Sequence, residues 1–253
     1  MAKQHYSTRT VVLIGLFAAI CYVSLYLRIP IPSPVGKPFL HMGNMFVILA
    51  ALLFNGFIGG TAGSIGMGLY DLMNGYGSSA LRTFILKFGI GVITGKIAAK
   101  KEQQSAKSPV KWIFIAAVVF IVLGLTLFTV TRVIGYQIDV PSIDKELVIS
   151  PVLYIFALVL GIALAIASFL SQRFSRDIQY AIIGAVAGIA FNIVGEFLFK
   201  VGLLLIAGSS FYPAVLASVV SLPATLINGT FSIIAAVALY IPLSKAVARF
   251  THF

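Results

Sequence analysis

Long apolar runs separated by short polar connectors dominate this sequence. Hydrophobic residues make up 60% of the 253 and charged residues only 10%, whereas soluble domains contain about 45–50% and about 25%. A soluble fold of this length could not bury so much apolar surface, so lipid must cover part of it. A membrane-crossing helix needs roughly 20 mainly apolar residues. The sequence therefore predicts an all-α, polytopic helical bundle with eight spans, at about 10–28, 43–56, 58–75, 81–99, 112–135, 151–171, 178–199 and 212–245.

The basic connectors predict how these spans are oriented. With a cytoplasmic N-terminus and eight crossings, eleven of the 18 Lys and Arg residues fall inside, six fall outside and Lys87 lies within a span. Cytoplasmic loops are normally the more basic ones, so both termini are expected in the cytoplasm. The net charge of +11 is then a feature of membrane orientation. It does not indicate nucleic-acid binding, because the basic residues form no stripe interleaved with aromatic residues.

Several classes of chemistry lack their sequence signals. Cys21 is the single cysteine, so no disulfide framework is expected. His5, His41 and His252 are too scattered to predict a metal site. No phosphate-binding loop or catalytic set is recognisable, so we expect neither an enzyme nor a bound cofactor. The first apolar stretch has no small-residue cleavage site and is interpreted as a retained span.

The spans differ in composition. Residues 43–99 are dense in glycine, which lets membrane helices approach closely. Residues 112–171 are aliphatic, as expected of lipid-facing helices, and the polar segment 100–111 separates the two parts. In the last span, Pro223 predicts a kink. Asn228 follows it and would either bond backbone freed by the kink or face a pocket; both interpretations stay open.

Three ionisable residues lie inside the predicted spans, where each costs about 2.5–3.5 kcal/mol on insertion scales. Asp71, Lys87 and Glu196 all fall in the outer half of the bilayer. One interpretation is structural, with Asp71 and Lys87 forming an ion pair between neighbouring helices. The other is a polar pocket that opens outward, in which Glu196 acts together with Asn192, four residues earlier on the same helix face.

The first loop and the first span carry two further signals. Residues 28–42 are rich in proline and predict a stiff, extended segment. This segment is either an inert connector or a lid over an outward pocket. In the first span, Gly15 and Ala19 form a pair of small residues four positions apart, which is typical of a strip that receives another membrane helix.

Three stretches stand out together: HMGNMFVILAALLFNGFIGGTAGSIGMGLYDLMNGY (41–76), TFILKFGIGVITGKIA (83–98) and LPATLINGTFSIIAAVALY (222–240). They resemble the substrate-binding S components of energy-coupling factor (ECF) importers, in particular the group of riboflavin-type and related vitamin S components. The resemblance covers roughly 1–99 and 178–250. It implies a six-helix core built from these two parts, with 106–176 inserted as an extra helix pair.

The resemblance also implies a function. An S component binds a water-soluble vitamin outside the cell and docks on an ECF module of one transmembrane coupling subunit and two ATPases. ATP hydrolysis then belongs to those partners, and the chain is expected in a bacterial plasma membrane. In this family the small-residue strip of the first span is the docking surface, and here Gly15 and Ala19 occupy it. The first loop is the family's gate over the ligand.

The predicted vitamin site lies in the outer leaflet and is rich in aromatic residues, which suits stacking on a flat heteroaromatic ring. The few charged groups favour vitamin B6 (pyridoxine or pyridoxal), with riboflavin next. The residues predicted to line the site are His41, Asn44, Tyr76, Lys87, Asn192, Glu196, Tyr212 and Asn228.

Two other functions remain open on the same residues. In a secondary transporter that works alone, Asp71, Lys87 and Glu196 would form a proton or ion relay. In a membrane scaffold without a ligand, the same charges would be structural. A proton-coupled carrier should work alone in liposomes under a pH gradient, whereas an S component should bind its ligand alone but accumulate it only with the ATPase module.

Overall fold

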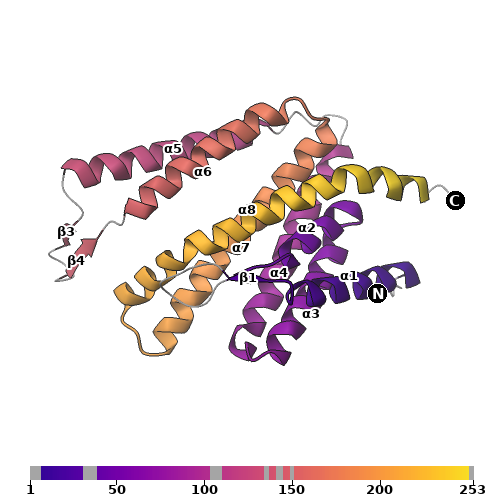
Figure 1. Cartoon of the computed structure of the whole chain (residues 1–253), viewed down its shortest axis with the longest axis horizontal. Helices are drawn as coiled ribbons and strands as arrows, with labels where there is room; N and C mark the ends of the chain where they lie inside the picture. The colour runs from indigo at the N-terminus through magenta and orange to yellow at the C-terminus, as the bar shows by residue number, and fades with distance from the viewer. Residues whose placement is uncertain are drawn as a thin grey trace, which may run out of the picture. The chain divides into compact units, whose positions relative to one another are not determined.

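Eight α-helices account for most of the residues that the computed structural model describes (Figure 1). The described residues are 7–30, 39–102, 110–133, 137–140, 145–148 and 151–250. The chain divides into two units, one formed by 1–106 with 180–253 and the other by 107–179. Helix α7 (Arg176–Ile206) begins at the end of the second unit and lies mainly in the first.

The first unit holds all eight residues predicted for the site, and its helices and strands form a single packed group. Helices α3 and α4 pack along each other, α3 also contacts α1 and α2, and α2 lies against α4 and α8. Strands β1 and β2 pair antiparallel, which brings the two ends of the first loop together. In chain order the elements are α1 (Thr8–Ser24), β1 (Ile29–Pro30), β2 (Phe39–Leu40), α2 (Gly43–Leu53), α3 (Gly56–Met73), α4 (Gly77–Ala98), the 3-10 helix η1 (Ala99–Glu102), α7 and α8 (Phe211–Phe250).

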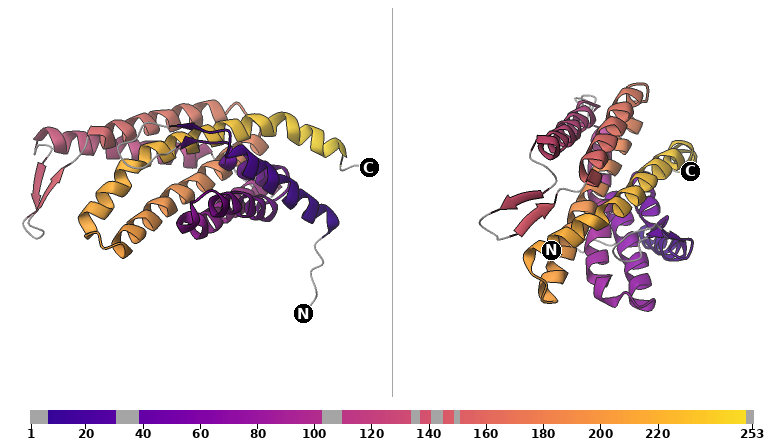
Figure 2. Two further views of the ribbon diagram at one scale, coloured as in Figure 1. Left: turned by 60° about the horizontal axis from the view of Figure 1, so that its bottom comes forward. Right: turned by 60° about the vertical axis from the view of Figure 1, so that its left-hand side comes forward.

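The second unit is a helical hairpin, formed by α5 (Val110–Val133) and α6 (Pro151–Ser171). The two helices lie side by side (Figure 2). Close contacts of Gly124 with Leu158 and of Gly161 with Ile121 show that they run antiparallel. Between them, β3 (Gln137–Val140) and β4 (Lys145–Val148) form a two-stranded antiparallel hairpin.

Local sequence signals explain where several helices begin and end. The Ser7 side chain accepts a hydrogen bond from the Thr10 N–H at 3.3 Å and caps α1. Asn55 caps α3 in the same way, with Ile58 N–H donating at 2.9 Å. Gly75, at φ +83°, makes the turn between α3 and α4. Glycine adopts this left-handed conformation without the steric cost that a side chain would add.

Glycine pairs set the close packing of α3 against α4. A Cβ atom added at Gly91 would lie 2.1 Å from the backbone nitrogen of Gly60, and one added at Gly95 would lie 2.2 Å from that of Gly56. The two backbones therefore touch directly at both levels. Without water to drive helices together, such close van der Waals packing is a principal source of helix association in membranes.

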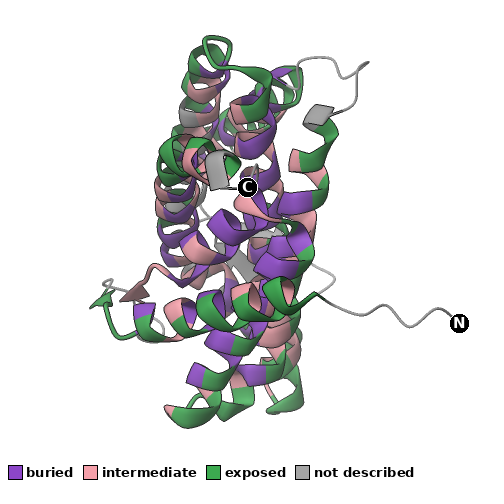
Figure 3. Ribbon diagram, turned by 90° about the vertical axis from the view of Figure 1, so that its right-hand side faces the viewer, coloured by how far each residue is buried: buried purple, intermediate pink, exposed green. Residues whose placement is uncertain are grey.

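Glycines also let α3 and α4 approach their other neighbours. On α3, Gly59 lies against the backbone of α2 at Ala51, and Gly66 lies against the Ala18 carbonyl of α1. On α7, Gly188 lies against the Ile90 carbonyl of α4. Helix α2 is buried along nearly its whole length. Figure 3 shows the buried residues of the described chain in purple. The glycine-rich part of the sequence is therefore where the helices pack most closely, as predicted.

The all-α class predicted from the sequence is confirmed, and each predicted span overlaps one of the eight helices in the described residues. Among these residues, three helices are long and apolar enough to cross a membrane: Val110–Val133, Arg176–Ile206 and Phe211–Ala248. Shorter apolar helices lie at Thr8–Ser24, Gly43–Leu53 and Ala157–Ser171. The count of eight crossings and the cytoplasmic termini remain predictions. Helix α8 continues through Pro223 as one helix, so the proline does not interrupt it.

Candidate functional site

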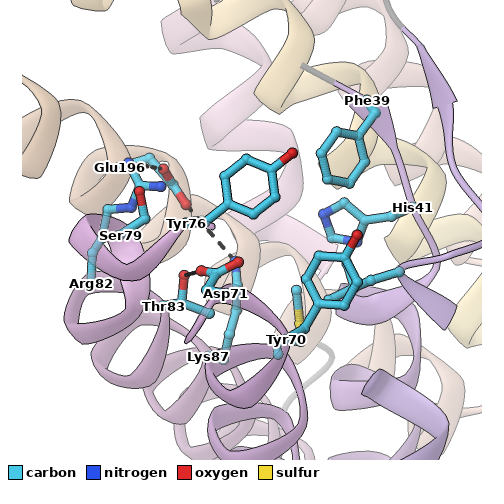
Figure 4. Close-up of a pocket in the computed structure, with 12 residues that line it drawn as sticks. Phe39, His41, Tyr70, Asp71, Tyr76, Ser79, Arg82, Thr83, Lys87 and Glu196 are labelled. Carbon is cyan, nitrogen blue, oxygen red and sulfur yellow. Dashed lines mark hydrogen bonds and ion pairs between the residues drawn. The ribbon is translucent and has the colours of Figure 1, made fainter. Parts of the chain in front are cut away.

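A cavity of about 230 Å³ lies in the first unit (Figure 4). Helices α3 and α4 supply most of its lining, and strand β2 and helix α7 contribute from the sides. The lining residues are Leu25, Phe39, His41, Met67, Tyr70, Asp71, Tyr76, Ser79, Arg82, Thr83, Lys87 and Glu196. The cavity therefore combines aromatic rings with acidic and basic side chains.

Aromatic rings form one wall of the cavity. In Figure 4, Phe39, His41 and Tyr70 lie on one side, with Tyr76 between them and the charged residues opposite. The rings of Tyr70 and Tyr76 are nearly parallel, with an interplanar angle of 14° and centroids 6.4 Å apart. The Phe39 and His41 rings are tilted by 59° with centroids 5.6 Å apart. Flat faces presented in this way suit stacking on a planar ligand.

His41 has one ring nitrogen engaged and the other available. The Gly43 N–H donates to His41 Nδ1 at 3.1 Å, so the neutral ring carries its proton on Nε2. Burial, and secondly the charge of Lys87, lowers the pKa of His41 to about 3. The backbone N–H of His41 donates to Asn228 Oδ1 at 3.5 Å. At neutral pH His41 is therefore an uncharged hydrogen-bond donor at the cavity.

A charged network joins α4 to α7 at the opposite side of the cavity. Lys87 Nζ donates to Asn192 Oδ1 at 2.8 Å and lies 3.9 Å from Glu196 Oε1. Arg82 lies 3.3 Å from Glu196 Oε2. Lys87 is only 4% exposed, so its ammonium depends on these partners. Two basic and two acidic side chains line the cavity, and their formal charges balance.

Asp71 and Lys87 do not form the predicted ion pair, because neither ion pair of the described residues joins them. Asp71 accepts a hydrogen bond from Thr83 Oγ1 at 2.5 Å, whereas Lys87 pairs with Glu196. The reason is helix packing: Gly195, one residue before Glu196, brings α7 against α4, so the long lysine side chain finds its partners on α7.

Four residues predicted for the site line the cavity: His41, Tyr76, Lys87 and Glu196. Asn192 and Asn228 do not line the cavity, but they accept hydrogen bonds from two residues that do. Asn192 accepts from the Lys87 ammonium, and Asn228 accepts from the His41 backbone N–H. The other two, Asn44 and Tyr212, do not line it. Asn44 is buried, and its Oδ1 has no hydrogen-bond partner among the described residues.

The prediction of the site omitted Ser79, Arg82 and Thr83. Ser79 and Thr83 lie eight and four residues before Lys87, so all three share one face of α4. This spacing could have identified them once Lys87 was chosen. Arg82 has no such signal, because it lies five residues before Lys87, which is not a spacing of one helix face.

A cluster around Arg28 lies next to the aromatic wall. The Arg28 guanidinium donates to the hydroxyls of Tyr70 at 3.4 Å and Tyr76 at 3.5 Å. It also lies 5.1 Å from the centroid of the Phe39 ring. The Tyr26 ring packs edge-on against Tyr70, with centroids 5.1 Å apart. Residues from the end of α1, from β2 and from α3 with its following turn therefore meet here.

The predicted docking pair lies on an open face of α1. A Cβ atom added at Gly15 would meet nothing within 4 Å, and Ala19 is exposed. Large apolar side chains nearby on the same helix are exposed as well, namely Val12, Leu16 and Val23. This face is therefore free of contacts from the described chain.

Comparison with known proteins gives one family and one relative. Residues 5–153 match the model of the family described as ECF-type riboflavin transporter, S component. Over 77 residues the chain is 40% identical to an "Uncharacterized protein in gap 3'region" of Pyrococcus woesei, covering 30% of this chain and 50% of that protein. The chain thus spans about half the length of the curated relative that it matches. No solved structure matches.

Apolar helices around a small cavity lined by aromatic and charged residues define a helical membrane protein. The chain belongs to the family of ECF-type riboflavin transporter S components, because the match covers more than half of its residues. The resemblance inferred from the sequence is thereby confirmed. The match includes α5 and ends at the start of α6, and it does not reach 178–250. The assignment of 106–176 as an insertion stays a prediction.

Proposed function

We propose that this chain is the substrate-specificity subunit of an ATP-driven ECF importer and binds a water-soluble vitamin in the cavity of its first unit. The observation that carries the proposal is the pairing of an aromatic wall with a charge-balanced polar wall in one cavity. A flat heteroaromatic ring would stack on Tyr76 and its neighbours. Its polar substituents would bond to His41, Lys87 and Glu196.

Vitamin B6 is the preferred ligand, with riboflavin second. Pockets for drug-sized ligands usually enclose about 300–1,000 Å³, whereas this cavity encloses about 230 Å³. A single pyridine ring with short substituents needs less space than the three fused rings of riboflavin. The uncharged His41 Nε2–H and the Lys87 ammonium are donors suited to ring nitrogen and hydroxyl acceptors.

Calorimetry of the detergent-purified full chain against pyridoxine, pyridoxal, riboflavin and other water-soluble vitamins tests the proposal. We expect saturable binding of one member. Glu196→Gln should weaken it by removing a charged partner of both Lys87 and Arg82. Tyr212→Phe, at a predicted position that does not line the cavity, is the matched control and should bind as the wild type does. Absence of binding to every vitamin would refute the proposal.

The proposed transport partners are one transmembrane coupling subunit and two ATPases. Gly15 and Ala19, on the open face of α1, are the proposed docking strip. Gly15→Leu with Ala19→Leu should abolish vitamin uptake by the assembled importer and leave vitamin binding unchanged. Loss of binding as well would show that this face serves folding instead.

The charged network also supports the rival function, a secondary transporter that works alone. Asp71, Lys87 and Glu196 all contribute to one cavity, as a proton relay would require. Reconstitution decides between the two. An S component should accumulate vitamin in liposomes only together with its ATPase module, whereas a proton-coupled carrier should do so alone under a pH gradient.

The proposed division into a core and an added helix pair can be tested by deletion. The predicted insertion, 106–176, nearly coincides with the second unit, 107–179. A chain that joins residue 105 to residue 177 through a short linker should still fold and bind vitamin. If it loses both properties, the helix pair belongs to the core.

A further inference from the structure

Arg28 is a cation at the cavity's aromatic wall that forms no ion pair with an acidic residue in the described part of the chain. Both ion pairs of the described residues belong to Glu196, with Arg82 and Lys87. Arg28 instead contacts two phenol hydroxyls and one ring face. It is exposed and does not itself line the cavity. Its contacts are therefore not explained by charge neutralisation.

These contacts connect elements that are far apart in the sequence. Arg28 directly precedes β1, whose Ile29 pairs with Leu40 of β2. The ladder thus places Arg28 beside the Leu40 end of β2, which leads into His41, and Phe39 is the residue before Leu40. The hydroxyls of Tyr70 and Tyr76 belong to the end of α3 and to the turn before α4. The Arg28 guanidinium therefore links the β1–β2 ladder to the end of α3 and the turn before α4.

Arginine is suited to this task. Its planar guanidinium presents several N–H donors in a fixed fork and also stacks on aromatic faces. Two hydroxyls 3.4 and 3.5 Å from the same Nη1 atom, with a ring face 5.1 Å from Cζ, use both properties. A lysine ammonium keeps the charge but does not provide the fork, so it would hold this arrangement less well.

We propose that Arg28 is a positioning residue, which holds Tyr70 and Tyr76 in their parallel arrangement and thereby controls access to the cavity and the rate of ligand release. Both tyrosines line the cavity, and their rings are only 14° from parallel. Without Arg28 the two phenols keep their ring contacts but lose the common donor that aligns their hydroxyls. The aromatic wall formed by Tyr70 and Tyr76 then opens the cavity to solvent more often.

Cysteine labelling tests access without any ligand. Met67 lines the cavity and is 4% exposed, and native Cys21 is fully buried and supplies the background rate. In full-length chain carrying Met67→Cys, a water-soluble methanethiosulfonate reagent should label slowly. Adding Arg28→Ala should raise the labelling rate about tenfold, because the variant loses two hydrogen bonds and a cation–π contact. Arg28→Lys should give an intermediate rate.

Two matched variants make the test specific. Arg132 lies 5.2 Å over the Phe128 ring and does not line the cavity, so Arg132→Ala removes a similar cation–π contact as a control. It should leave the labelling rate unchanged. Tyr70→Phe with Tyr76→Phe removes only the hydroxyls, and Arg28→Ala should add little in that background. Equal labelling with and without Arg28, or equal acceleration by Arg132→Ala, would overturn the proposal.

A second experiment measures release of a bound vitamin, and it rests on the proposed function. If the wild type binds pyridoxine or riboflavin, Arg28→Ala should raise the dissociation rate of that vitamin about tenfold, with a smaller change in the association rate. Unchanged dissociation would overturn the proposed control of release. If the wild type binds neither vitamin, the proposed function fails, whereas the labelling experiment still decides the role of Arg28.

Discussion

Lys87 of α4 donates a hydrogen bond to Asn192 of α7 across 2.8 Å, between residues 105 positions apart in the chain. Both side chains are buried, at 4% and 3% exposure. The bond joins the two helices directly behind the cavity and places the lysine ammonium at its lining. Integrity of the site and packing of the two helices therefore depend on the same pair.

Asn192→Ala should destabilise the protein by about 2 kcal/mol, because a buried ammonium loses its nearest acceptor. Vitamin affinity should fall as well, since Lys87 is no longer held. Thermal unfolding in detergent and calorimetry measure the two effects. Asn192→Asp restores an acceptor and should recover much of the stability. Equal stability of the alanine variant and the wild type would show that Lys87 does not need this bond.

The effect of pH on stability should depend on His41. Its pKa is lowered to about 3 in the folded chain, whereas an unfolded histidine titrates near 6.5. Between these values the unfolded state binds the extra proton, so stability falls as pH decreases from about 6.5 toward about 3. His41→Asn keeps an acceptor for the Gly43 N–H and removes this titration.

The measurement is the melting temperature of wild type and His41→Asn across that pH range. The difference between them should change in favour of the variant as pH falls. A constant difference would show that His41 titrates alike in both states. Above pH 7, histidine is neutral in both states and contributes no pH dependence.

Gly91→Ala should destabilise the packing of α3 against α4. Its Cβ would lie 2.1 Å from the Gly60 backbone nitrogen, so the helices must move apart. Overpacking of this kind typically costs about 1–3 kcal/mol, and backbone contact places it at the upper end. Gly15→Ala is the control, because nothing lies within 4 Å of its added Cβ. Similar melting temperatures for both variants would contradict direct backbone contact at Gly91.

Phosphate esters of the bound vitamin should bind at least about tenfold more weakly than the free alcohol. A phosphate adds about −1.5 to −2 charge, and the two basic groups of the lining are already balanced by Asp71 and Glu196. Competition calorimetry with pyridoxal and pyridoxal phosphate, or with riboflavin and its phosphate, measures this ratio. Glu196→Gln removes one negative charge from the cavity and should therefore reduce the difference in affinity between the free alcohol and the phosphate ester. Tighter binding of the phosphate ester by the wild type would show that the basic residues are free to receive an anion.

Much of the fold follows from local sequence signals. Apolar runs predict the helices, and in the structure Asn55 caps the start of α3 and Gly75 makes the turn after it. The ionisable residues within apolar runs drew attention to Lys87 and Glu196, and both line the cavity. Each of these signals acts within a few residues, so sequence alone carries it.

The partners of the ionisable residues required the tertiary structure. Asp71 and Lys87 lie on adjacent helices and were the natural pair, yet Thr83 binds one and α7 supplies the partners of the other. Arg28 and Arg82 had no distinguishing pattern in the sequence. Their roles depend on which side chains of distant segments come within hydrogen-bond reach.

Lipid exposure and close helix contact restrict residue types position by position. The amino-acid sequence therefore shows that this chain is a membrane protein of packed, glycine-rich helices, and it shows which family the chain resembles. Which rings and charges share one cavity is visible only in the three-dimensional structure. Interhelical distances and side-chain directions set that arrangement, and they follow from the packing of all the helices together.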